Sequence, residues 1–169
     1  MTLGETMDRL KALGSQKIRE MNARNGSGEN QFGVKMGDLR TLAKSIKTNP
    51  ELAEALWQTG NVDAMILATL LMRPKQITTE GLERMVSSVT FAHLADWLGT
   101  HVVKLHPEKE MLRLKWMESS DAMNSRAGWS LTAERIARDS GCFATTPPPR
   151  VARRLSRPLW IAEMIRRQD

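Results

Sequence analysis

Apolar residues recur along most of this chain at the spacing of an α-helix. Near the start, Leu3, Met7 and Leu10 follow one another at intervals of three or four residues, which places their side chains on one helical face. A half-buried β-strand needs alternating apolar and polar residues instead, and no run alternates cleanly over six residues. The pattern therefore predicts an all-α protein.

Glycine, proline and capping residues divide this pattern into short helices with short joints. Asp38 and Asn61 are expected to cap helices, and Pro50 and Pro107 fit a first helical turn, where the missing proline N–H costs nothing. Residues 62–72 are apolar nearly all round, which indicates a buried helix. We expect helices at residues 3–13, 15–24, 39–46, 51–58, 62–72, 79–86, 90–105, 107–118 and 121–138. The inner stripe of the helix at residues 90–105 is expected to contain Leu94, Trp97, Leu98, Val102 and Leu105.

Two stretches of the chain echo each other. Leu56-Trp57 is followed by a break and then by Asp63-Ala64-Met65, whereas Lys115-Trp116 is followed by a break and then by Asp121-Ala122-Met123. The offset of 58 to 59 residues corresponds to two helix-pair units, and residues 80–105 between them have the same layout. Stacked antiparallel helix pairs form an α-solenoid with an extended concave face. The alternative is an ordinary helical bundle in which the match arises by chance.

The composition changes after Arg138. Three consecutive prolines within residues 141–150 exclude a continuous helix there, and only residues 159–167 have a helical pattern. We therefore expect a helical repeat domain over residues 1–138 and a Pro/Arg-rich tail, poorly ordered or weakly helical, over residues 139–169. A frame-altered end and a basic arm that grips phosphates both stay open as explanations of this tail.

The charge balance favours a polyanionic partner. There are 25 Lys and Arg residues against 19 Asp and Glu residues, which gives a formal net charge of +6. Cys142 is the only cysteine, so an intrachain disulfide and a cysteine-based zinc site are both excluded. Residues 1–13 lack the apolar core of a signal peptide, and the apolar run at residues 64–72 is too short to span a bilayer. We expect a cytoplasmic monomer that binds no membrane.

The run Phe32-Gly33-Val34-Lys35-Met36-Gly37-Asp38-Leu39-Arg40 resembles the DNA alkylation repair enzymes, whose repeat region opens with an aromatic-Gly-Val segment that leads into a helix with Leu and Arg. Residues 54–64, 91–102 and 116–129 are similar to later family motifs in the same order. The resemblance implies HEAT-like helix pairs whose basic concave face holds double-stranded DNA. It further implies release of N3- or N7-alkylated purines without base flipping and without a metal or cofactor.

By position in this resemblance, the catalytic acid is Asp96. An alkylated purine is cationic and leaves readily, so a carboxylate has only to stabilise the positive charge that grows on the deoxyribose or to orient the attacking water. The alternative is a helix-surface aspartate paired with an arginine or with His93. The active enzymes of the family place a tryptophan shortly before the acid, whereas residues 91–95 contain none and Trp97 lies about 100° further round the helix.

Three cations are the expected DNA contacts. Arg126 matches a basic residue of the family that meets the DNA backbone near the lesion, and its alternative role is an ion pair with Asp121 or near Asp139. Lys35 and Arg40 lie near a helix N-terminus, which favours phosphate, or are solvated surface charges.

Three hypotheses about function stay open at this point. They are an alkylpurine DNA glycosylase, a non-catalytic DNA-binding solenoid and a protein-binding helical scaffold. The three histidines are spaced for structural or surface roles, and no acid completes a metal-ligand set around them at helical spacing.

Overall fold

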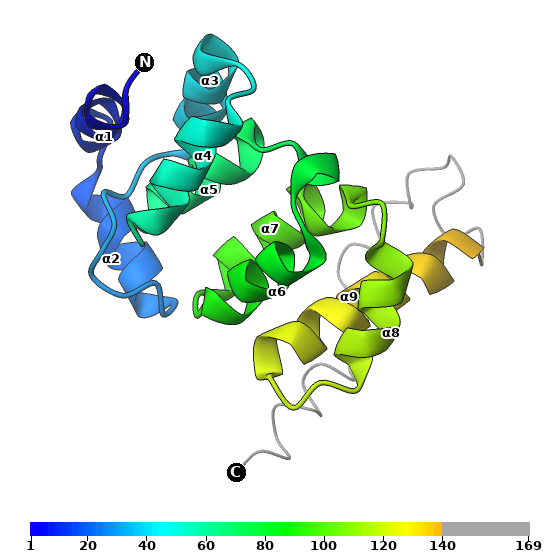
Figure 1. The fold of residues 1–169 in the computed structure, drawn as a ribbon. Coiled ribbons are helices and arrows are strands. Elements are labelled where there is room, and N and C mark those ends of the chain that lie inside the picture. The colour runs from blue at the N-terminus through cyan, green and yellow to red at the C-terminus, as the bar shows by residue number, and fades with distance from the viewer. Residues whose placement is uncertain (140–169) are drawn as a thin grey trace, which may run out of the picture. The chain divides into compact units, whose positions relative to one another are not determined.

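The structure, a computed structural model of the 169-residue chain, describes residues 1–139. Over these residues it contains helices and one isolated β-bridge between Gly14 and Val34, so the all-α prediction is confirmed there. Residues 1–134 form one compact unit, and all of the helix contacts described here lie within that unit. The elements are α1 (Leu3–Ala12), α2 (Gln16–Arg24), α3 (Met36–Ile46), α4 (Pro50–Gln58), α5 (Val62–Leu71), the 3-10 helix η1 (Pro74–Gln76), α6 (Thr79–Ser88), α7 (Ala92–His101), the 3-10 helix η2 (Val103–Leu105), α8 (Lys109–Met117) and α9 (Ala122–Asp139) (Figure 1). The tail expected at residues 139–169 lies outside the described residues from position 140 onward.

Local capping chemistry places several helix starts where the sequence predicts them. The side chain of Asn61 accepts hydrogen bonds from the backbone N–H groups of Asp63 and Ala64, and Pro50 occupies the first position of α4. The prediction that Asp38 caps α3 is wrong. The N-cap residue is Lys35, and Asp38 lies in the first turn, where its negative charge still suits the positive end of the helix dipole.

The helix expected at residues 90–105 ends early. α7 stops at His101, and η2 continues in its place, so Leu105 is 61% exposed and does not belong to the inner stripe. The change of direction brings His106 into the core, where only 4% of it is exposed. Its Nδ1 accepts the N–H of Glu108, so its Nε2 carries the proton and donates to the carbonyl of Ile77 at 2.9 Å.

The core centres on α5, which contacts α3, α4 and α7. All but one of its ten residues are buried, as its apolar sequence predicts. The sequence echo corresponds to the helix pairs α4/α5 and α8/α9, because Trp57 and Trp116 are buried near the ends of α4 and α8. The indole N–H of Trp116 donates to Glu83 at 3.2 Å, which ties α8 to α6.

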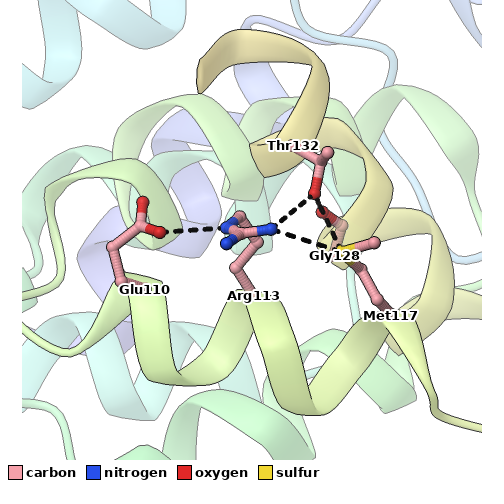
Figure 2. Close-up of polar contacts among 5 residues, drawn as sticks. All are labelled: Glu110, Arg113, Met117, Gly128 and Thr132. Carbon is pink, nitrogen blue, oxygen red and sulfur yellow. Dashed lines mark hydrogen bonds and ion pairs between the residues drawn. The ribbon is translucent and has the colours of Figure 1, made fainter. Parts of the chain in front are cut away.

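The pair α8/α9 is held by a polar contact and a close approach, both visible in Figure 2. Arg113 donates from Nε to Glu110 at 2.9 Å and from Nη1 to the hydroxyl of Thr132 on α9 at 3.2 Å. The same Nη1 lies 3.3 Å from the sulfur of Met117. Gly128 makes this approach possible, since a Cβ there would lie 2.7 Å from the backbone nitrogen of Met117.

Candidate nucleic-acid interface

Two of the predicted site residues meet on the surface of the fold. Asp96 lies on α7 and Arg126 on α9, and the guanidinium Nη2 donates to the carboxylate Oδ1 at 2.8 Å. Their side chains are 65% and 50% exposed, so the ion pair is open to solvent. The alternative partner considered for Arg126, Asp121, instead caps α9 by accepting the N–H groups of Met123 and Asn124.

Beside this ion pair lies a hollow of about 250 Å³ between α7 and α9. Its other lining residues are Val86, Ala95, Leu98, Gly99, Thr100, Val103, Lys104, Met123, Ala127, Ser130 and Leu131. No aromatic ring is among these lining residues, so the hollow itself offers apolar walls but no ring on which a cationic base could stack. Lys104 is partly neutralised by Glu134 at 3.3 Å.

Trp97 takes part in a different contact. Its ring stacks on that of His101 with centroids 4.2 Å apart, and the guanidinium of Arg40 lies over it at 5.2 Å from the centroid. This cation–π contact joins α3 to α7 at Trp97, the residue that follows Asp96 in the sequence. The indole nitrogen of Trp97 is buried without a hydrogen-bond partner among the residues that the structure describes.

Arg40 therefore contacts α7 through Trp97, whereas Lys35 makes no such contact with any described residue. Lys35 is exposed at the N-cap of α3 and forms no ion pair with any residue in the described range. We use the name α7 surface for Arg40, Asp96, Trp97 and Arg126. With two cations and one carboxylate, it carries a net charge of +1.

A buried carboxylate that the sequence reasoning missed fixes the start of α3. Asp63 is 1% exposed and accepts three backbone N–H groups, from Phe32 at 2.6 Å and from Gly33 and Val34 at 2.9 Å each. Hydrogen bonds to an ionised acceptor are the strong ones, so this clamp holds the entry to α3 firmly. The sequence does contain a signal for this role, because Asp63 is an acid within an otherwise apolar helix that is predicted to be buried.

Over the described residues, no cluster of three or more His, Cys, Asp or Glu residues is arranged to hold a metal ion. Within the same residues, no helix combines the length and the apolar character that crossing a membrane requires.

The chain is similar in sequence to known proteins. A family model described as "DNA alkylation repair enzyme" matches residues 6–164, which extends beyond the range of the resemblance seen in the sequence. Two uncharacterized proteins, from Listeria innocua and Listeria monocytogenes, are each 29% identical over 109 residues, covering 62% of this chain and 48% of their own length. The chain thus spans about half the length of these curated relatives.

A solved structure also resembles the chain. Its description reads "A new family of proteins related to the HEAT-like repeat DNA glycosylases with affinity for branched DNA structures". It is 34% identical, with a TM-score of 0.71, and the match covers 77% of this chain and 55% of that one. Together with the order of the helices, this likeness confirms the predicted stack of HEAT-like helix pairs.

Proposed function

The chain belongs to the DNA alkylation repair enzyme family, and from that premise we propose that it is a DNA repair protein that binds double-stranded DNA through the α7 surface. The observation that carries this proposal is the exposed pairing of Arg126 with Asp96 at 2.8 Å. A guanidinium held on the surface by one carboxylate can exchange that partner for a phosphate of DNA. An exposed ion pair stabilises a protein by only about 0–1 kcal/mol, so this exchange is inexpensive.

Arg40 supplies the second phosphate contact. It lies over the ring of Trp97, so its guanidinium is already ordered before DNA arrives and loses less conformational freedom on binding. Phosphate contacts of this kind carry no sequence information, and binding is therefore expected to be independent of sequence and sensitive to salt.

The structural relative with affinity for branched DNA suggests the form of DNA to test. We propose that this chain binds duplex arms within branched structures as well as linear duplexes. Fluorescence anisotropy with a labelled linear duplex, a four-way junction and a replication-fork mimic, each at several salt concentrations, measures this directly. Binding that falls steeply with salt supports the proposal. Equal, negligible binding of all three DNAs overturns it and favours the protein-binding scaffold.

Excision of alkylated purines is a second candidate function, favoured by the 65% exposure of the Asp96 carboxylate. A carboxylate in the open can approach a deoxyribose, as the glycosylase chemistry requires. The hollow beside Asp96 offers no aromatic ring among its lining residues, which favours binding without excision. Base release from methylated duplex DNA, compared with the Asp96→Asn variant, separates the two. Release no greater than that of the variant eliminates the glycosylase.

We further propose that the chain works as a monomer in the cytoplasm, in keeping with its single cysteine. Light scattering at the concentrations used for DNA binding tests whether the chain is a monomer.

A further inference from the structure

A second, wider hollow in the described part of the chain lies away from the Asp96–Arg126 pair. It has a volume of about 800 Å³ and is lined by residues of α4, α5, η1, α6 and the start of α7. Leu94 lines it, and Asp96 lies two residues further along the same helix, about 200° around the helix axis. The hollow, which we name the α4–α6 groove, and the Asp96–Arg126 pair therefore lie on different sides of α7.

The charged residues of the α4–α6 groove favour an anionic occupant. Arg73 and Arg84 are exposed at the groove, and neither forms an ion pair or side-chain hydrogen bond with any described residue. Glu54 is the single acid among the lining residues, and its carboxylate accepts a hydrogen bond from Gln58 at 2.7 Å. The groove thus presents two unpaired cations against one carboxylate that is already engaged.

The remaining lining residues suit unpaired nucleotides. Polar side chains that can reach base edges belong to Gln76, Thr78, Ser88 and Thr90. Apolar side chains, such as those of the half-buried Met72 and Ile77, offer a surface for the base faces. The volume of this hollow lies in the range of small-molecule sites and suits one or two nucleotides of a single strand. A positively charged groove that follows the backbone is one usual element of single-strand binding, in combination with side chains on which bases stack.

We propose that the α4–α6 groove binds a single-stranded arm of branched DNA, with Arg73 and Arg84 on its phosphates. This inference rests on the proposed DNA-binding function and extends it, because a second site on another side of α7 lets one molecule hold a duplex and a single strand together. A fork with single-stranded arms is then bound more tightly than a four-way junction, which has none.

The test compares the wild-type chain with the double variant Arg73→Gln/Arg84→Gln on three labelled DNAs. These are a linear duplex, a four-way junction and a fork with single-stranded arms. The variant is expected to lose the preference for the fork, and its salt slope on the fork falls by about 0.7 for each lost single-strand phosphate contact. Its binding of the linear duplex stays unchanged. The control Lys11→Gln/Lys17→Gln removes the same charge from α1 and α2, and should leave fork binding as it is.

The outcomes separate this inference from the proposed function. If the wild-type chain binds none of the three DNAs, the proposed function itself fails. If it binds DNA but shows no preference for the fork, or if the double variant retains that preference, the groove assignment is overturned while DNA binding stands. A competition experiment identifies the class of molecule that the groove binds. An oligothymidylate of ten nucleotides should displace the fork from the groove. If a glutamate-rich peptide displaces it and the oligothymidylate does not, the assignment is overturned.

Discussion

Asp96 and Arg126 neutralise each other across two helices, with the carboxylate of α7 2.8 Å from the guanidinium of α9. The residue predicted to perform chemistry and the residue predicted to hold the DNA backbone are therefore partners in the free protein. Under the proposed function, a phosphate that approaches Arg126 has to compete with Asp96. We therefore expect the aspartate to weaken DNA binding by the arginine with which it is paired.

The first prediction concerns this competition. Asp96→Asn keeps the shape of the side chain and removes its charge, so we expect duplex affinity to rise about twofold to fivefold, the equivalent of a surface ion pair. Anisotropy titration at low salt measures the change. An unchanged or weaker affinity would show that Asp96 does not compete with phosphate for Arg126.

Arg126→Ala is expected to act in the opposite direction. One lost phosphate contact lowers the salt slope of duplex binding by about 0.9, and it weakens binding equally for different sequences. Lys11→Ala, which removes an exposed cation from α1, serves as the control and should leave the slope unaltered. If the Arg126→Ala variant keeps the salt slope of the wild-type chain, this arginine does not contact DNA phosphate.

Trp97 is expected to act as a positioning residue for Arg40. Trp97→Leu removes the ring beneath the guanidinium, so DNA affinity should fall about as far as it does in Arg40→Gln. Trp97→Phe restores an aromatic face and should recover part of the loss. The double variant Trp97→Leu/Arg40→Gln should be no weaker than either single variant, since both disturb one contact. Additive losses would mean that the two residues act separately.

The Asp63 clamp predicts a large effect on stability. Asp63→Ala leaves two buried N–H groups and one partly buried N–H group without this acceptor, which is expected to lower the free energy of unfolding by about 3 kcal/mol. Asp38→Ala, an acid in the first turn of α3, should cost only about 0.3–1 kcal/mol through the helix dipole. Urea denaturation followed by circular dichroism compares them. Similar losses in the two variants would contradict the clamp.

Two glycines in helices should respond oppositely to alanine. At Gly128 a Cβ would lie 2.7 Å from the backbone of Met117, so Gly128→Ala is expected to destabilise the chain by about 1–3 kcal/mol through overpacking. At Gly99 no atom lies within 4 Å of the built position, so alanine there should stabilise by up to about 1 kcal/mol through helix propensity. Thermal unfolding of both variants checks the contrast, and equal shifts would refute it.

Local chemistry made some of the fold predictable from sequence, and long-range contacts made the rest inaccessible. Asn61 and Pro50 act within one helical turn, so their positions in the sequence were enough to place helix starts. Asp38 failed as a cap because Asp63, distant in sequence, fixes the segment before α3 and lets the helix begin earlier. Asp96 and Arg126 could each be chosen from sequence, but their pairing across 30 residues is a property of the stacked helices.

The hydrogen bonds that Asp63 accepts also predict how the sequences of related proteins diverge. Gly33 has a φ of 76°, and a Cβ there would lie 2.6 Å from the carbonyl oxygen of Ser15, so only glycine fits at this point. The acid and the glycine serve a single turn of the backbone. Among divergent relatives we expect Asp63 and Gly33 to be conserved together or replaced together. Covariation between the two positions would then identify, from sequence alone, the chains in which an acid holds the segment before α3.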